Sequence, residues 1–276
     1  MSNRFQLTRV ASCAVMLAVA CASAAPAQPT PAPATPAAEQ SAPGTPLAKE
    51  KHGRDGQASP PPTCALPKDQ VSDCFADHLA REVLHNTWFG IPTLQNPLDV
   101  WITQEIISQT KPDFIIETGT FVGGSAALWA TILEQVNPKG RVITVDIHDA
   151  SKKNRETLPI FKRRIDFLLG SSTAPETFEK IKRRVGKGSV MVILDSGHTE
   201  HHVLDELRLY APLVHVGGYI VVQDGFFDGK QPTGFGPGPK AAAEAFLAEN
   251  DAFVADRDRE RLKGSFNPMG FLRRVK

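Results

Sequence analysis

Short apolar runs alternate with segments of helical spacing through the second half of this chain. Five runs are expected as buried strands because they are apolar and end in polar or turn-forming residues. They span residues 114–116, 142–145, 165–169, 190–194 and 219–222, with helices expected between them at 125–136, 174–185 and 200–209. Strands that alternate with helices form a parallel sheet covered on both faces. With two closing strands in "DAFVAD" and "MGFLRRV", the sequence predicts an α/β fold with a doubly wound, mostly parallel sheet of seven strands.

The N-terminal part has a different composition. Residues 1–27 carry two arginines, an apolar run and then small residues, which is typical of a signal peptide or a lipoprotein leader with a weak cleavage site before Cys21. Residues 28–68 are rich in Pro and Ala and cannot offset their ordering entropy by burial, so we expect a disordered linker. The folded domain is expected over 69–276, beginning with two helices.

The leader predicts an exported protein, either periplasmic, secreted or lipid-anchored, and it leaves membrane anchoring through the N-terminus open. A start codon chosen too far upstream would instead give a cytoplasmic protein. In an exported chain, Cys64 and Cys74 suit one disulfide that closes a short loop.

The chain has 31 Lys and Arg residues against 30 Asp and Glu residues, so no overall field attracts nucleic acid. The sequence leaves a homo-oligomer open.

Polar side chains stand at the carboxyl ends of the expected strands, where ligands bind in doubly wound sheets. In chain order they are Glu117, Asp146, Ser171 with Ser172, Asp195, and Gln223 with Asp224.

The first of these strand ends runs into the segment "ETGTFVGGS". Its glycines let the backbone turn sharply and approach a ligand, and the helix that follows presents free N–H groups. The spacing differs from the G-x-G-x-x-G fingerprint of dinucleotide-binding proteins. Glu117 would repel a pyrophosphate but suits a cationic amino group, so a turn without a ligand explains this segment less well.

Asp146 ends the next strand, where an acid can accept both hydroxyls of a ribose. A turn or cap role is the alternative. Together with Glu117, Asp146 favours ribose binding.

Asp195 and Asp224 end two further strands and, with Gln223 and water, form a candidate Mg²⁺ site. Each aspartate alone could instead cap a helix. His198 lies in the turn after Asp195 and is predicted as a general base or an orienting group, whereas His201 and His202 are expected on a helix surface or in ordinary packing.

Three quoted stretches carry a family resemblance: "NTWFGIPTLQNPLDVWITQEIISQTKPDFIIETGTFVGGSAALWA", "DSGHTEHHVLDELRLYAPLVHVGGYIVVQDG" and the run between them. They resemble the rhamnosyl O-methyltransferase/cephalosporin hydroxylase family. The resemblance implies the Rossmann-like sheet of class I methyltransferases and an S-adenosylmethionine-dependent, Mg²⁺-assisted O-methyltransferase. Its expected acceptor is a hydroxyl of a small glycosylated or hydroxylated compound.

The resemblance also implies roles for residues. The methionine part of the cofactor would lie against Glu117, Gly119, Thr120, Gly124 and Ser125, its ribose against Asp146, and its adenine near Ser171 and Ser172. Asp195 and Asp224 match metal carboxylates. We predict Asp195 and His198 as the catalytic residues, with His198 or a bound water taking the substrate's proton. Gln223 replaces a common Glu, and Gly197 replaces the second Ser of a "DSSH" motif, which puts strong Mg²⁺ binding in doubt.

Two other functions were weighed. An exported, catalytically inactive binding protein of the same fold at the cell envelope is favoured by the leader and by Gln223, but opposed by the intact "ETGTFVGGS". An NAD-dependent oxidoreductase is disfavoured by the glycine spacing.

Overall fold

The computed structural model describes residues 68–229 and 236–276. The predicted leader, nearly all of the predicted linker and the side chains of Cys64 and Cys74 lie outside the described part, so the predicted disulfide stays a prediction. Among the described residues, no helix combines the length and the apolar character needed to cross a membrane.

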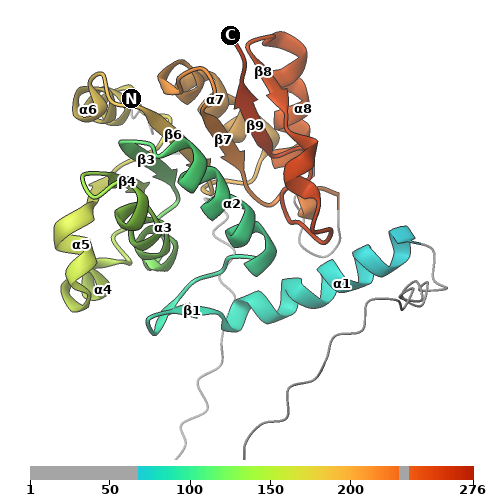
Figure 1. Cartoon of the computed structure of the whole chain (residues 1–276), viewed down its shortest axis with the longest axis horizontal. Helices are drawn as coiled ribbons and strands as arrows, with labels where there is room; N and C mark the ends of the chain where they lie inside the picture. The colour runs from blue at the N-terminus through green and yellow to red at the C-terminus, as the bar shows by residue number, and fades with distance from the viewer. Residues whose placement is uncertain (1–67, 230–235) are drawn as a thin grey trace, which may run out of the picture. The chain divides into compact units, whose positions relative to one another are not determined.

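The centre of the domain is a seven-stranded sheet in the order β5-β4-β3-β6-β7-β9-β8 (Figure 1). Its strands are β3 (Phe114–Thr118), β4 (Arg141–Asp146), β5 (Ile165–Leu169), β6 (Val190–Leu194), β7 (Tyr219–Val222), β8 (Phe253–Ala255) and β9 (Phe271–Arg274). The five strands β5, β4, β3, β6 and β7 pair in parallel, and β9 runs antiparallel to both of its neighbours, β7 and β8. The predicted α/β fold with a mostly parallel seven-stranded sheet is confirmed.

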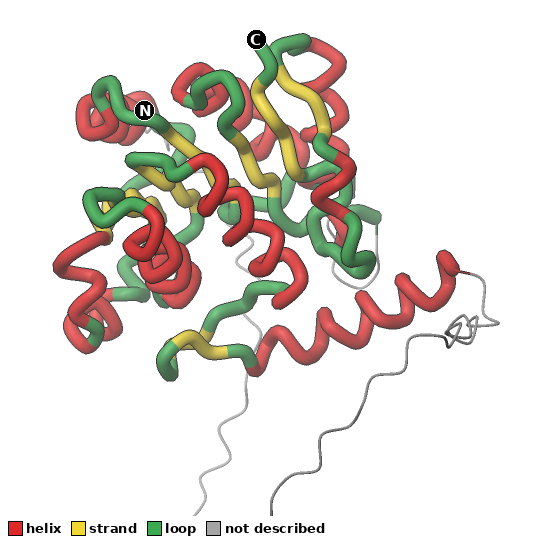
Figure 2. Tube along the Cα trace, in the orientation of Figure 1, coloured by secondary structure: helices red, strands yellow, loops and turns green. Residues whose placement is uncertain are grey.

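Helices cover both faces of the sheet, so that the strands lie between helical layers (Figure 2). The main helices are α2 (Pro97–Thr110), α3 (Gly124–Val136), α5 (Pro159–Arg164), α6 (Pro175–Val185), α7 (Glu200–Tyr210) and α8 (Pro239–Glu249). Successive side chains of a strand point to opposite faces. Accordingly, Ile115 packs in the core shared with α2, α3 and α5, whereas Ile116 packs with α6, α7 and α8.

The remaining elements are short, apart from the first helix. They are α1 (Lys68–Glu82), η1 (Val83–His85), β1 (Thr87–Trp88), β2 (Ile91–Pro92), α4 (Lys152–Thr157), η2 (Ala211–Leu213), η3 (Gly225–Phe227) and η4 (Arg257–Glu260). The small hairpin of β1 and β2 was not predicted, because two-residue strands give no periodic signal.

The start of α2 fixes the position of the segment before it, which contributes residues to the cleft. The side chain of Asn96 accepts a hydrogen bond from Leu98 N at 3.0 Å, and Pro97 occupies the first turn, as expected for a helix start. The chain ahead of α2 reaches α3, because a Cβ at Gly124 would lie 2.2 Å from Pro92 O.

Candidate active site

A cleft of about 520 Å³ lies beyond the carboxyl ends of the parallel strands. From β3 the chain continues outwards through β4 to β5, and it then crosses to β6 on the other side of β3, which makes this the switch point of the sheet. Every predicted site residue except Glu117 and Gln223 lines this cleft.

The glycine turn after β3 is fixed by close backbone contacts. Gly119 has φ of +86°, and a Cβ there would lie 1.8 Å from the backbone oxygen of Asp195. Gly119 N donates to Val145 O at 2.8 Å, and Gly123 N donates to Thr120 O at 2.8 Å. The glycine at 119 is therefore required both by its left-handed backbone and by the approach of the neighbouring loop.

Glu117 lies behind the turn and has no exposed surface. Thr144 Oγ1 donates to its Oε2 at 2.6 Å and also lies 2.7 Å from Thr120 Oγ1. Its Oε1 has no hydrogen-bond partner among the described residues. Burial raises the pKa of Glu117 to about 8, so the isolated side chain is mostly protonated at neutral pH.

Asp146 serves the turn as well as the cleft. Its Oδ2 accepts from Phe121 N at 2.8 Å and its Oδ1 accepts from His148 N at 2.9 Å. These two bonds fix the loop that follows β3 and the one that follows β4. The turn role weighed from the sequence is thus present in the geometry, and ribose binding stays a prediction.

Ser171 and Ser172 follow β5 on the same side of the cleft. Ser171 Oγ lies 3.1 Å from Thr173 Oγ1, and Tyr210 Oη donates to Ser172 O at 2.7 Å. Both serines line the cleft, and their contact with an adenine stays a prediction.

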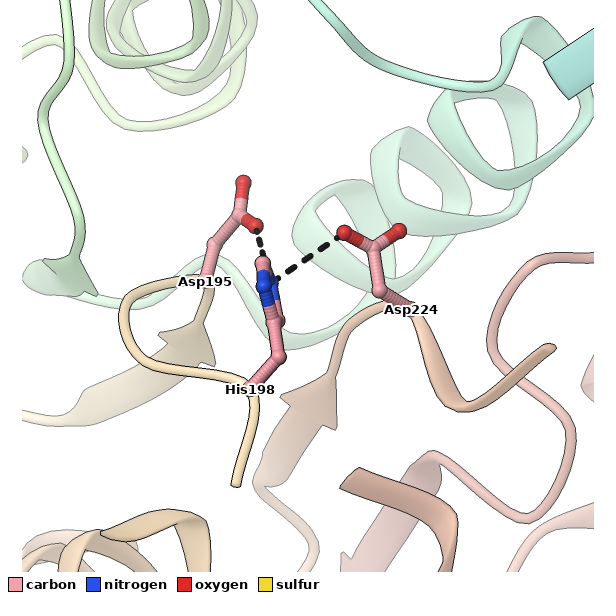
Figure 3. A group of neighbouring side chains, drawn as sticks. All are labelled: Asp195, His198 and Asp224. Carbon is pink, nitrogen blue, oxygen red and sulfur yellow. Dashed lines mark ion pairs between the residues drawn. The ribbon is translucent and has the colours of Figure 1, made fainter. Parts of the chain in front are cut away.

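Asp195, His198 and Asp224 lie close together (Figure 3), and all three line the same cleft. The Nε2 atom of His198 lies 3.2 Å from Asp224 Oδ2 and 3.7 Å from Asp195 Oδ1. Burial disfavours the charged imidazole, but the two neighbouring carboxylates favour it more strongly and raise the pKa of His198 to about 10. In this arrangement the imidazolium itself neutralises the two acids.

The same three residues also suit a metal ion. One ligand atom from each of them lies within 4.8 Å of the others. Carboxylate oxygens are the ligands that Mg²⁺ prefers, with water completing its shell. The donor set therefore fits a divalent cation held between Asp195 and Asp224.

Gln223 lies away from this cluster and is almost fully buried. Its Nε2 donates to Gln95 Oε1 at 3.0 Å, and Gln95 Nε2 donates in turn to Asp195 Oδ2 at 2.9 Å. The Gln223 amide thus reaches the cluster through Gln95. Whether Gln223 ligates a metal stays a prediction.

Gln95 was missed by the sequence analysis. It is buried and links the cluster to the segment before α2, yet "TLQNP" carries no catalytic pattern. The only available signal was its place directly before a helix cap, Asn96.

The position of Asp224 is fixed by a backbone hydrogen bond that the sequence did not indicate. It has φ of +67°, and its backbone N–H donates to Asn267 Oδ1 at 3.0 Å. Asp99, buried in α2, accepts from Ser265 Oγ at 2.6 Å and Phe266 N at 2.7 Å and so fixes the segment next to Asn267.

Comparison with known proteins identifies the family. The profile of the Rhamnosyl O-methyltransferase/CmcI family matches residues 81–275. The chain belongs to this family. It is an S-adenosylmethionine-dependent O-methyltransferase, as the sequence analysis predicted.

Two curated relatives are named rhamnosyl O-methyltransferase. The protein from Mycobacterium bovis (strain BCG / Pasteur 1173P2) is 39% identical over 194 residues, which cover 67% of this chain and 77% of the relative. The protein from Mycobacterium leprae (strain TN) is 35% identical over 215 residues, which cover 75% of this chain and 91% of the relative.

Among solved structures, this family member is similar to one described as "cmcI-D160 Mg-SAM", with a TM-score of 0.54, 19% identity and coverage of 70% of this chain and 78% of that chain. At this identity the likeness supports the fold alone. It confirms the class I methyltransferase arrangement of the sheet.

Proposed function

We propose that this O-methyltransferase acts on a sugar hydroxyl of a small glycosylated acceptor, and that Asp195 and Asp224 hold a Mg²⁺ ion in the reacting complex. The name of the mycobacterial relatives supports a deoxyhexose such as a rhamnosyl group. One structural observation carries the proposal: the glycine turn and the acid–histidine cluster share one cleft, with Gly119 packed directly on Asp195.

The chemistry is an in-line displacement. The acceptor oxygen forms a bond to the methyl carbon, the carbon–sulfur bond breaks, and the sulfonium becomes a neutral thioether. The protein's task is to hold the oxygen and the methyl group in line, since orientation lowers the barrier without a covalent intermediate. A divalent cation between Asp195 and Asp224 would supply a lowered pKa for the bound hydroxyl.

The hydroxyl proton needs an acceptor. His198 lies beside both carboxylates and lines the cleft, so we assign its Nε2 as the base that takes this proton. Its protonated form balances the acids when no other cation is present, and its neutral form is the one that takes the proton.

The test combines cofactor binding with methyl transfer. Calorimetry of S-adenosylmethionine with the folded chain should show binding with a dissociation constant on the order of micromolar. Transfer of a labelled methyl group should occur to a small rhamnoside and be reduced by a metal chelator.

Asp195→Ala should lower transfer by about a hundredfold or more while the chain stays folded. Asp205→Ala removes an exposed acid of α7 and is the matched control, expected to be near wild type. Full activity of Asp195→Ala, or transfer unaffected by chelator, would contradict the proposed cation site.

Export of the enzyme is a separate proposal that rests on residues 1–27. Export would separate the enzyme from its methyl donor, because S-adenosylmethionine is made in the cytosol. Fractionation of cells that express the full chain, with its N-terminus determined by mass spectrometry, distinguishes a cleaved exported protein from a cytoplasmic one.

A further inference from the structure

We propose that His202 is a positioning residue that ties the loop after β5 to the turn after β6 and thereby holds that turn, which carries Asp195 and His198. This rests on the proposed function, in which that turn carries the reacting groups. The sequence analysis had placed His202 on a helix surface or in ordinary packing. Instead, its side chain lines the cleft.

The contacts of the imidazole join the two loops. His202 Nε2 lies 3.0 Å from Ser196 Oγ, in the turn after β6, and 3.4 Å from Ser172 Oγ, in the loop after β5. No backbone hydrogen bond joins these two loops among the described residues. The side chain of His202 is therefore well placed to fix the distance between them.

A buried carboxylate sets the position of this imidazole. Glu206 has no exposed surface, accepts from Ser196 Oγ at 2.7 Å and lies 3.4 Å from His202 Nε2. Tyr210, which donates to Ser172 O at 2.7 Å, is one turn further along α7. Residues 202, 206 and 210 are spaced by four and share one helical face, so α7 presents a polar stripe to the loops after β5 and β6.

The ring of His202 also packs against Gly197. A Cβ at Gly197 would lie 3.0 Å from Cδ2 and 3.3 Å from Cγ of His202, so the ring fills the space that a side chain at 197 needs. The glycine between Ser196 and His198 and the histidine at 202 thus fit each other. Helix stability gives no reason for a histidine here, because a cation in the first turn of a helix is unfavourable.

The experiment compares His202→Ala with two related variants. His202→Ala should lower kcat by about tenfold to a hundredfold, because a shift of the turn misplaces the reacting groups, and it should weaken S-adenosylmethionine binding. His202→Gln keeps an amide nitrogen near the Nε2 position and should recover a large part of both. His201→Ala alters the neighbouring exposed histidine of α7 and should match wild type.

A double-mutant cycle identifies the coupling. If His202 acts through Ser196, then Ser196→Ala combined with His202→Ala should lose much less kcat than the product of the single losses. Fully multiplicative losses, or a His202→Ala enzyme with lowered melting temperature but unchanged kcat and cofactor affinity, would overturn the proposal in favour of a purely structural role.

Failure of the proposed function can be recognised separately. If the wild type binds S-adenosylmethionine but methylates no sugar acceptor, the acceptor or the cation site is wrong, and the comparison of cofactor affinities among the His202 variants still decides this inference. Equal affinity in wild type and His202→Ala would then overturn it.

Discussion

The two ends of the cleft are built in different ways. The end next to β3 is a continuous stretch from Glu117 to Ser125 whose shape is fixed by backbone contacts, above all at Gly119. The end next to β6 and β7 consists of side chains from separate loops, joined by Gln95 from a segment one hundred residues away in sequence. A continuous backbone cradle tolerates little change in any residue, whereas a distributed side-chain cluster can be adjusted one residue at a time.

The sharpest test of the backbone end is Gly119→Ala. The added Cβ would clash with Asp195 O and would also force an alanine into a left-handed conformation, so we expect a loss of about 3 kcal/mol or more in the free energy of unfolding. Urea unfolding monitored by circular dichroism measures it.

Gly217→Ala is the matched control for this change. Gly217 has φ of +87° and no atom within 4 Å of an added Cβ. Gly217→Ala should therefore lower the free energy of unfolding only by the cost of a left-handed alanine, about 1 kcal/mol. Equal losses in the two variants would show that the contact between the turn and the Asp195 loop does not constrain the cradle.

The ionisation of Glu117, at the end of the cleft next to β3, should make the stability of the fold depend on pH. Because its folded pKa of about 8 lies above the model-compound value of 4.5, Glu117 stabilises the fold as the protonated acid. That contribution is complete below pH 4.5 and is lost as the pH rises through 8. At about 1.4 kcal/mol per pH unit, the free energy of unfolding of wild type should fall by about 3 kcal/mol relative to Glu117→Gln between pH 4.5 and 7.

The same variant tests the predicted contact with the cofactor's amino group. A cation beside Glu117 favours the carboxylate, so cofactor binding at pH 7 should release close to one proton from wild type and less from Glu117→Gln. Calorimetry in buffers of different ionisation enthalpy counts these protons. Equal release from both proteins would contradict the amino-group role.

The sequence predicted the continuous end of the cleft better than the end that is built from separate loops. The glycine turn and its acid form one local pattern, and each strand end was marked by a polar residue, so the fold and the cleft lining could be anticipated. Gln95 and Asn267 act through contacts that only the folded chain creates. The role proposed for His202 depends on Glu206, whose burial is a property of the packed helix and not of the local sequence.

The smallest expected effect sharpens the account of the distributed end. Gln223→Glu restores the acid that the family commonly has, and it places a carboxylate against Gln95 Oε1, which now accepts from the Gln223 amide. Loss of that buried hydrogen bond should cost about 1 to 2 kcal/mol of unfolding free energy without metal. Affinity for Mn²⁺, a probe for Mg²⁺, should rise, because a further negative charge next to the cluster favours a cation. Gln135→Glu makes the same charge change on the exposed side of α3 and should alter neither quantity. If Gln223→Glu were as stable as wild type and bound Mn²⁺ no better, the link from Gln223 through Gln95 to Asp195 would have no role in tuning the cation site, and the substitution in this chain would be neutral.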